Sequence, residues 1–278
     1  MAKKRVDLLL VERGLADTRQ KAQAVIMAGQ VFTGERRCDK PGMTLEEDAP
    51  LEVRGQLRYV SRGGLKLEKA MQVFPITLEG KTAADIGAST GGFTDCMLQN
   101  GAARVYAVDV GYGQLAWSIR SDPRVVCLER TNARYLTAEQ IPEALDFASI
   151  DVSFISLGLI LPALRPLMAA DGQIAALVKP QFEAGRDKVG KKGVVRDPAV
   201  HLEVLEHFLD HAAQADFSVL GLDFSPIRGP EGNIEYLGFL QAGAGERAGV
   251  DLKELVDRAQ PAGKGGGTVA LGTAAPPL

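Results

Sequence analysis

Two lysines and two carboxylates stand where they could carry out proton chemistry. Lys66 lies in a helix predicted to precede the first strand of a sheet, and Asp151 and Lys179 end the fourth and fifth predicted strands. Glu235 begins the last predicted strand. Each residue alone is better explained by a surface salt bridge. Together they fit the deprotonation of an alcohol, because a nearby ammonium lowers the pKa of a hydroxyl and a lysine with a depressed pKa accepts its proton.

A glycine-rich turn separates a predicted strand from a predicted helix, in the segment Asp85-Ile-Gly-Ala-Ser-Thr-Gly-Gly-Phe93. The apolar run 82–84 is the strand, and residues 93–100 form the helix that Gly101 ends. Backbone N–H groups in such a turn can approach a ligand closely. The pattern D-x-G-x-x-x-G-G differs from the dinucleotide fingerprint G-x-G-x-x-G. It resembles the pattern of S-adenosylmethionine methyltransferases, whose ligand carries an ammonium that Asp85 could hold.

A sulfonium donor beside two lysines favours transfer of a methyl group to an alcohol. A ribose 2′-hydroxyl is a poor nucleophile and must lose its proton during attack, while the carboxylates hold the lysines and set their charge. Positioning of the donor supplies much of the remaining acceleration. Asp109 ends the second predicted strand, 24 positions after Asp85, where it could accept hydrogen bonds from a ribose diol. The alternative role for Asp109 is a helix N-cap, since Gly111-Tyr-Gly follows.

Composition sets limits on the class of protein. The chain has 278 residues, 46% of them hydrophobic, and a net charge of −3, enough for one large core and a small second domain. Three scattered cysteines without C-x-x-C spacing favour a reducing compartment, and no disulfide or metal site is expected. His201, His207 and His211 fall in one predicted helix, where His207 and His211 share a face. Ordinary surface histidines explain them better than a metal site because no third ligand is nearby. Without a signal-peptide pattern or a run of 18 apolar residues, a cytoplasmic protein is expected.

Residues 1–57 are predicted to form a compact unit of two helices and short strands. Gly14 and Gly29 end the helices, and Asp17 with Gln20 is expected as a capping box for the second. Residues 1–40 hold nine Lys or Arg against five acids, a local balance of +4, and such local basicity matters for contact with phosphates. A unit of this size is a marginal independent core, so we expect an appendage.

Strands and helices alternate from residue 61 onward, after a linker expected at residues 58–60. The pattern predicts β-α-β units and a parallel sheet within residues 61–243. The last two strands, 217–223 and 234–240, are joined by a turn-rich loop, which predicts a hairpin and one antiparallel strand near the edge. Residues 244–278 are expected to hold one short helix, within 246–259, and a disordered Gly-, Ala- and Pro-rich tail.

Several long segments together resemble one known family. The chain is similar to the TlyA family, which joins an N-terminal S4 RNA-binding domain to an FtsJ/RrmJ-like methyltransferase. The segments that carry the resemblance are Ser61-Arg-Gly-Gly-Leu-Lys66, Asp85–Phe93, Asp109-Val-Gly-Tyr-Gly-Gln-Leu-Ala-Trp117, Glu129-Arg-Thr-Asn-Ala-Arg134, Asp151-Val-Ser-Phe-Ile-Ser-Leu157, Leu177-Val-Lys-Pro-Gln-Phe-Glu183 and Gly232-Asn-Ile-Glu-Tyr236. The implied fold is a Rossmann-like α/β methyltransferase sheet behind an S4-like α+β domain.

The resemblance also implies a function and site residues. It implies 2′-O-methylation of cytidine in ribosomal RNA, with S-adenosylmethionine as cofactor and ribosomal RNA or ribosomal subunits as partner, in a chain that we expect to be a monomer. The family's K-D-K-E tetrad maps onto Lys66, Asp151, Lys179 and Glu235. The cofactor residues expected are Asp85, Gly87, Ser89, Thr90, Gly91, Gly92, Phe93, Asp109 and Asn132. The RNA-contacting residues expected are Arg5, Arg19 and Lys40.

The linker and one basic stretch carry further predictions. Where the family often has Arg-x-Trp-Val, this chain has Arg58-Tyr-Val60, which removes the tryptophan from the linker. The basic stretch 183–196 contains several glycines and is expected to be a mobile loop that clamps RNA.

The alternatives to the enzyme are a non-catalytic RNA-binding or ribosome assembly factor and a membrane-active haemolysin. No membrane span and no basic amphipathic segment support the haemolysin.

Overall fold

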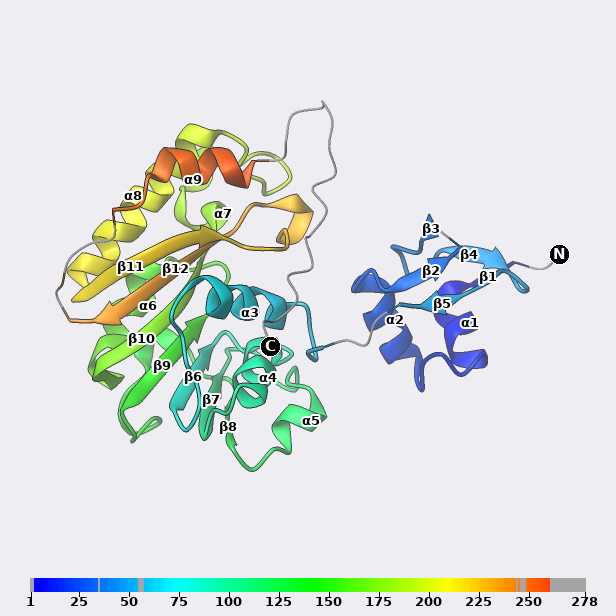
Figure 1. Ribbon diagram of the computed structural model, residues 1–278, viewed down its shortest axis with the longest axis horizontal. Helices are drawn as coiled ribbons and strands as arrows, with labels where there is room; N and C mark the ends of the chain where they lie inside the picture. The colour runs from blue at the N-terminus through cyan, green and yellow to red at the C-terminus, as the bar shows by residue number, and fades with distance from the viewer. Residues whose placement is uncertain (1–2, 35, 55–57, 244, 246–248, 261–278) are drawn as a thin grey trace, which may run out of the picture.

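The computed structural model describes residues 3–34, 36–54, 58–243, 245 and 249–260. Figure 1 shows a small N-terminal unit followed by a larger unit built around one sheet. The predicted disordered tail, residues 261–278, lies outside the described residues, as do residues 246–248 of the predicted last helix.

The N-terminal unit packs two helices on short strands. Its buried core is apolar and comes from both helices, from β2 and from the residue after β3, namely Val6, Leu10, Ala22, Ile26, Val31 and Cys38. Strand β1 pairs with β4, and β2 lies between β3 and β5. The elements are β1 (Lys3–Arg5), α1 (Val6–Glu12), α2 (Arg19–Met27), β2 (Val31–Thr33), β3 (Arg36–Arg37), β4 (Thr44–Glu46) and β5 (Glu52–Val53).

The predicted capping box of α2 is wrong by one position. Thr18 is the N-cap, and its side chain accepts a hydrogen bond from Lys21 N at 3.2 Å. Asp17 instead pairs with the Lys21 ammonium at 2.5 Å. Either side chain could cap a helix, and the extended backbone at Thr18, with φ −139° and ψ 157°, makes this residue the N-cap.

A seven-stranded sheet forms the second unit, in the order β11-β12-β10-β9-β6-β7-β8. Neighbours from β10 to β8 are parallel, whereas β12 is antiparallel to both β10 and β11. The predicted hairpin and antiparallel strand near the edge are therefore confirmed. The strands are β6 (Thr82–Ile86), β7 (Arg104–Val108), β8 (Val125–Leu128), β9 (Leu145–Ile150), β10 (Met168–Val178), β11 (Phe217–Phe224) and β12 (Tyr236–Ala242).

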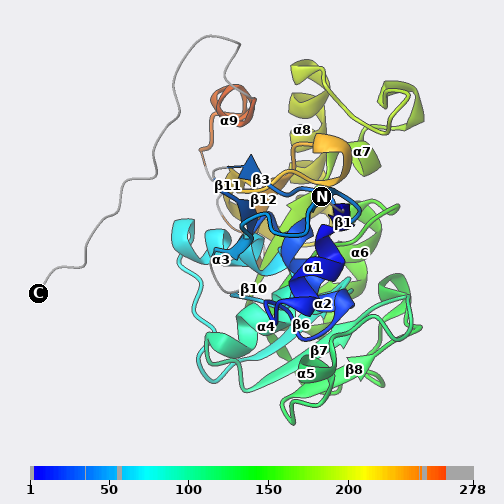
Figure 2. The same cartoon turned by 90° about the vertical axis from the view of Figure 1, so that its right-hand side faces the viewer.

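Helices cover both faces of this sheet, and each face has its own core. Successive residues of a strand point to opposite faces, so Phe147 enters one core and Ala148 the other. Figure 2 shows α3 and α4 on one side and α6 and α8 on the other. The helices are α3 (Gly63–Val73), α4 (Gly92–Gln99), α5 (Trp117–Arg120), α6 (Leu157–Leu164), α7 (Pro180–Glu183), α8 (Pro198–Gln214) and α9 (Leu252–Ala259), with short 3-10 turns η1 (Ala133–Tyr135), η2 (Arg165–Leu167), η3 (Arg186–Lys188) and η4 (Pro230–Gly232).

The reversed direction of β12 matters for the site. Val178 at the end of β10 is opposite Tyr236 at the start of β12, and Ile150 at the end of β9 is opposite Ala176. The first residue before an antiparallel strand therefore lies at the edge where the parallel strands end. This arrangement puts Glu235 beside the residues that follow β9 and β10.

Candidate active site

The four predicted ionisable residues meet in one cluster at this edge. Lys179 Nζ lies 2.5 Å from Asp151 Oδ1, and Lys66 Nζ lies 2.7 Å from Glu235 Oε2. Asp151 Oδ2 is 3.4 Å from Lys66 Nζ, so this carboxylate bridges the two ammonium groups. Lys66, Lys179 and Glu235 are 8%, 7% and 2% exposed. Two cations balance two anions within a largely buried cluster, and loss of one member would leave an uncompensated charge.

Close helix packing brings Lys66 to the cluster. A Cβ at Gly64 would lie 2.3 Å from the Tyr59 ring, and one at Gly92 would lie 2.2 Å from Ser61 Oγ. Glycines at these two positions allow the start of α3 to approach both Tyr59 and the start of α4. The predicted linker residues take part in this packing, because Tyr59 is buried in the core and Val60 N donates to Asp95 Oδ2 at 2.8 Å.

The glycine turn between β6 and α4 touches the ion-pair cluster. Gly87 has φ +90°, and a Cβ there would lie 2.6 Å from the carbonyl oxygen of Asp151. Gly91 has φ +96° and precedes α4 as its N-cap. Only glycine adopts such backbone angles without strain, and the missing side chains let this turn, the glycine cradle, pack closely against Asp151 and Leu115. Ser89 also takes a positive φ of 49° within this turn.

Asp85 lies beneath the cradle rather than in it. The side chain is fully buried, and its Oδ2 accepts hydrogen bonds from Thr94 N at 2.9 Å and Thr94 Oγ1 at 2.7 Å. Its Oδ1 accepts a third from Ser149 Oγ at 3.0 Å. Burial raises the pKa of this carboxyl from 3.8 to about 6, against the lowering effect of the three hydrogen bonds. Asp85 therefore fastens β6 to the start of α4, and its contact with a ligand ammonium stays a prediction.

Asp109 lines the cradle and also supports it. Its Oδ2 accepts from Ser89 N and its Oδ1 from Gly111 N, both at 2.7 Å. Each carboxylate oxygen keeps a further acceptor position. Asn132 lies across the same pocket, where its side chain caps the turn η1 by accepting from Arg134 N at 3.1 Å. The helix N-cap alternative for Asp109 is wrong, because the next helix, α5, has Ala116 as its N-cap. The side chain instead caps a turn and lines the cavity, and its contact with a ribose stays a prediction.

Three adjoining cavities lie at this edge of the sheet, and Asp151 lines two of them. The glycine-loop pocket has a volume of about 520 Å³ and is lined among others by Gly87, Ser89, Asp109, Asn132, Asp151 and Phe154. The lysine pocket, about 510 Å³, shares Gly87, Ser89 and Asp151 and adds Arg62, Lys66, Thr90, Gly92, Phe93 and Arg228. The aromatic pocket, about 690 Å³, shares Ser153 and Phe154 and adds Phe182, Arg186, Lys192 and Asn233. Every predicted cofactor residue except the buried Asp85 and Gly91 lines one of the first two.

Residues just beyond Asp151 were missed by the sequence analysis. Ser153 Oγ accepts from Lys179 Nζ at 3.1 Å. Phe154 is 90% exposed, has φ +64° and lies against the Phe182 ring with centroids 4.8 Å apart. A positive φ is strained for an aromatic residue and concentrates at functional sites. Their place directly after a strand that ends in Asp151 was the signal that could have found them.

Glu183 and Asn233 hold the loops around the aromatic pocket. Glu183 accepts from Ser156 Oγ at 2.6 Å and from Leu157 N at 2.8 Å, so it closes the start of α6. Asn233 accepts from Val195 N at 3.2 Å and donates to the Gly193 carbonyl at 2.8 Å. The basic stretch 183–196, predicted as a mobile clamp, is therefore tied to the loop that carries Glu235.

His201 corrects the prediction that the α8 histidines lie on a helix surface. Its ring is fully buried, with Nε2 3.0 Å from the Val195 carbonyl oxygen and Nδ1 2.9 Å from the Tyr236 hydroxyl. A carbonyl only accepts, so Nε2 carries the proton and Nδ1 accepts from Tyr236. Burial lowers the pKa of His201 below its usual 6.5. In the part of the chain that the structure describes, we find no group of three or more His, Cys, Asp or Glu placed to hold a metal ion.

The predicted RNA-contacting residues lie in the N-terminal unit. Arg5 and Arg19 both contact the carboxylate of Asp7, and Lys40 is exposed.

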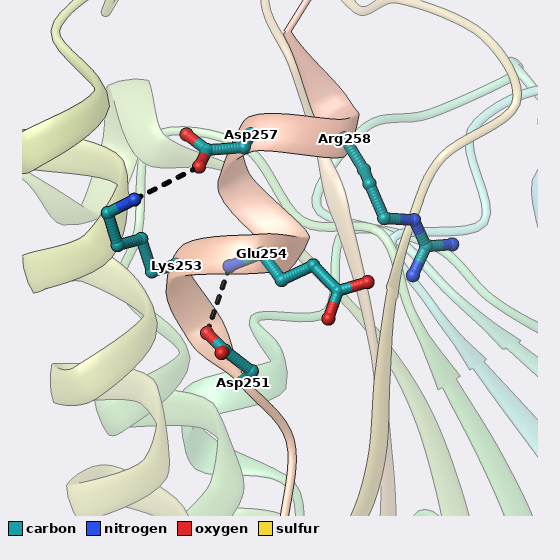
Figure 3. Close-up of a pocket in the computed structure, with 5 residues that line it drawn as sticks. All are labelled: Asp251, Lys253, Glu254, Asp257 and Arg258. Carbon is teal, nitrogen blue, oxygen red and sulfur yellow. Dashed lines mark hydrogen bonds and ion pairs between the residues drawn. The ribbon is translucent and has the colours of Figure 1, made fainter.

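A separate hollow lies far along the chain, on α9, where Lys253 pairs with Asp257 at 3.3 Å (Figure 3). The five lining residues, Asp251, Lys253, Glu254, Asp257 and Arg258, all belong to α9 or its cap, and none comes from the glycine turn or the cluster. Among the described helices, none combines the length and the apolar composition of a membrane span.

Known families match both units of the chain. The FtsJ-like methyltransferase model matches residues 59–242, and the S4 domain model matches residues 4–50. The Bacillus subtilis protein named "Putative rRNA methyltransferase YqxC" is 57% identical over 254 residues, which cover 91% of this chain and 90% of the relative. The Mycobacterium tuberculosis 16S/23S rRNA (cytidine-2′-O)-methyltransferase TlyA is 46% identical over 239 residues, 85% of this chain and 89% of the relative.

A solved structure agrees over nearly the whole chain. It is titled "Putative hemolysin from Streptococcus thermophilus", has a TM-score of 0.74 and 51% identity, and the match covers 93% of this chain and 96% of that one. The glycine cradle and the ion-pair cluster therefore sit in a known framework. The chain belongs to the FtsJ-like methyltransferase family, in the TlyA group that places an S4 domain before this fold.

Proposed function

We propose that this protein transfers the methyl group of S-adenosylmethionine to the 2′-hydroxyl of a cytidine in ribosomal RNA. The observation that carries the proposal is the position of Asp151. Its carboxylate bridges Lys66 and Lys179, and its carbonyl oxygen lies against Gly87 of the glycine turn. Proton chemistry and the cradle are thus joined through one residue. Relatives named as rRNA (cytidine-2′-O)-methyltransferases support the choice of substrate.

The glycine-loop pocket fits the cofactor that the family implies. Its volume of about 520 Å³ lies in the range of small-ligand sites, and Gly87 lets the turn lie directly against the Asp151 backbone in the wall of this pocket. Asp109 and Asn132 would face the ribose, and the N–H groups of the glycine turn would face the polar end. When bound, S-adenosylmethionine supplies a methyl group activated by a sulfonium.

The lysines supply what the acceptor hydroxyl lacks. Asp151 and Ser153 occupy two of the three N–H bonds of Lys179, and within the described residues the third has no acceptor. That N–H can donate to a ribose hydroxyl, lower its pKa and stabilise the oxygen as its proton passes to solvent water. Lys66 and Glu235 form the second ion pair, which keeps Asp151 between two cations. We assign Lys179 to the hydroxyl and the other three residues to holding its charge and place.

Surfaces on both units support RNA as the partner. The exposed Phe154 ring, which follows Ser153 in the chain and packs on Phe182, offers a face on which a splayed base can stack. The aromatic pocket also contains Arg186 and Lys192, which can meet phosphates. In the N-terminal unit, Arg5, Arg19 and Lys40 add further positive charge. Such a substrate would place the protein in the cytoplasm, and we propose that it acts there as a monomer.

The test is to map 2′-O-methyl groups on ribosomal RNA after incubation with the purified protein and S-adenosylmethionine. Small and large ribosomal subunits are assayed separately, from cells that lack the gene. Lys179→Ala should reduce methyl transfer by about 10²- to 10⁴-fold, the usual contribution of such a group, while S-adenosylmethionine still binds.

The matched control is Lys253→Ala, which removes a lysine from an exposed ion pair on α9. It should leave methyl transfer unchanged. Full activity of Lys179→Ala would refute the assignment of the cluster. An RNA-binding protein without turnover, the alternative considered above, would instead give no methyl groups with the unaltered chain.

A further inference from the structure

A fully buried carboxylate connects two arginines on the surface of the S4 domain. Asp7 is 0% exposed, and Arg5 holds both of its oxygens, with Nε to Oδ1 and Nη2 to Oδ2 each at 2.9 Å. Arg19 Nε donates to Oδ2 at 3.0 Å, and Gln23 Nε2 donates to the same oxygen at 3.0 Å. Four donors from α2 and the start of α1 therefore converge on one side chain.

This arrangement leaves the arginines able to meet a ligand. Their side chains are 43% and 54% exposed, although the carboxylate between them is not. Within the described residues, Nη1 of Arg5 and both terminal nitrogens of Arg19 have no acceptor. Arg5 and Arg19 carry two positive charges and Asp7 one negative charge, so this group of three keeps a surplus positive charge on its outer side.

The turn at Pro41 and Gly42 packs against one side of Asp7 and Arg5. Asp7 N donates to the Pro41 carbonyl at 3.3 Å, and a Cβ at Gly42 would lie 3.8 Å from the Arg5 guanidinium. This turn directly follows the exposed Lys40. The carboxyl of Asp7 stays charged at every working pH, because the hydrogen bonds from Arg5 hold its pKa well below the usual range.

Burial of a charge is unfavourable unless several donors compensate it, and here those donors are the two residues most suited to bind phosphate. A guanidinium held on one edge presents its remaining N–H groups in a fixed direction, which lowers the conformational entropy lost on binding.

We propose that Asp7 is a positioning residue for RNA recognition: it orients Arg5 and Arg19 so that their outer N–H groups meet neighbouring phosphates of ribosomal RNA. The inference deepens the proposed function and rests on it. Asp7 itself carries negative charge and touches no RNA; it acts through the two arginines.

The experiment compares Asp7→Asn with Asp39→Asn in the full-length protein, with ribosomal subunits as the probe. Asp39 pairs with Arg37 at 2.5 Å on the exposed surface of the same domain, so both variants add one positive charge. Charge alone predicts tighter binding for both. Positioning predicts that Asp7→Asn raises KM for subunits about tenfold, with kcat at saturating subunits and the affinity for S-adenosylmethionine unchanged, whereas Asp39→Asn does not weaken binding.

A double-mutant cycle completes the test. In an Arg5→Ala, Arg19→Ala background, Asp7→Asn should cause no further loss, because the groups it orients are absent. Unchanged or tighter binding by Asp7→Asn, when the arginine variants bind weakly, overturns the inference and leaves the proposed function intact. If the arginine variants also bind normally, Arg5 and Arg19 do not contact RNA. The assignment of these arginines to RNA contact and the positioning role of Asp7 then both fail.

A second variant covers unfolding of the S4 domain. If Asp7→Asn melts this domain, Arg5→Lys replaces it, because lysine keeps the charge but cannot hold both carboxylate oxygens side by side. Weaker subunit binding by Arg5→Lys, with an unchanged melting temperature, supports positioning. Full affinity of Arg5→Lys overturns it.

Discussion

Replacing Asp85 with Asn should stabilise the methyltransferase domain at neutral pH. The carboxylate is fully buried, and its pKa rises from 3.8 to about 6 on folding. The folded protein therefore binds this proton more tightly than the unfolded chain. The favourable contribution is complete below pH 3.8 and is lost as the pH rises to about 6. A difference of about two pKa units corresponds to about 3 kcal/mol.

The amide should keep the local hydrogen bonds. Its oxygen can accept from both Thr94 donors, and its NH₂ group can donate to Ser149 Oγ. The variant removes the buried charge but little else. The difference in unfolding free energy, Asp85→Asn minus the unaltered protein, should increase by about 3 kcal/mol from about pH 4 to about pH 7.

Urea unfolding followed by circular dichroism at several pH values measures this difference. Thr94→Val is the matched variant, because its hydroxyl donates to Asp85 at 2.7 Å and lowers the pKa of that carboxyl. It should move the pH dependence in the opposite direction to Asp85→Asn. A difference that stays flat with pH, or an Asn variant less stable than the unaltered protein at neutral pH, would refute this account of Asp85.

Three further outcomes are expected. Gly87→Ala should weaken S-adenosylmethionine binding by at least about tenfold in calorimetry, since its Cβ would lie 2.6 Å from the Asp151 carbonyl oxygen and φ is +90°; unchanged affinity would argue against the cradle. Glu183→Gln should lower the unfolding free energy by about 1 kcal/mol, because it weakens the closure of α6, and Glu203→Gln, in an exposed pair with Lys188, is its control. The lowered pKa of His201 means that stability is lost as the pH falls below 6.5, so His201→Gln should reduce the drop in melting temperature between about pH 7 and about pH 5; an equal drop in both proteins would contradict this role.

Local patterns in the chain were sufficient to predict most elements. The strand that ends before Gly87 and the helix that ends at Gly101 follow from an apolar run, positive-φ glycines and a stop signal, all within a few residues. The strand predicted at residues 125–128 matches β8. The cap of α2 was misassigned because Asp17 and Thr18 are both good caps, and only the backbone geometry selects between them.

Long-range contacts required the tertiary structure. Nothing local to Asp85 shows that its side chain is buried and accepts hydrogen bonds from Thr94 and Ser149. The burial of His201 depends on Val195 and Tyr236, which come from a loop and from the second strand from the sheet edge.

By itself the sequence determined which residue types are available and that a glycine turn follows a strand, because those features depend on short-range backbone preferences. Only the tertiary structure decided that Lys66, Asp151, Lys179 and Glu235 touch. Lys66 comes from a helix, Asp151 and Lys179 directly follow two parallel strands, and Glu235 directly precedes a reversed strand. Their ion pairs exist because the reversal of β12 brings its start to the edge where β9 and β10 end. The ion pairs at that edge depend on the order and direction of the strands, and no single segment of the chain determines these.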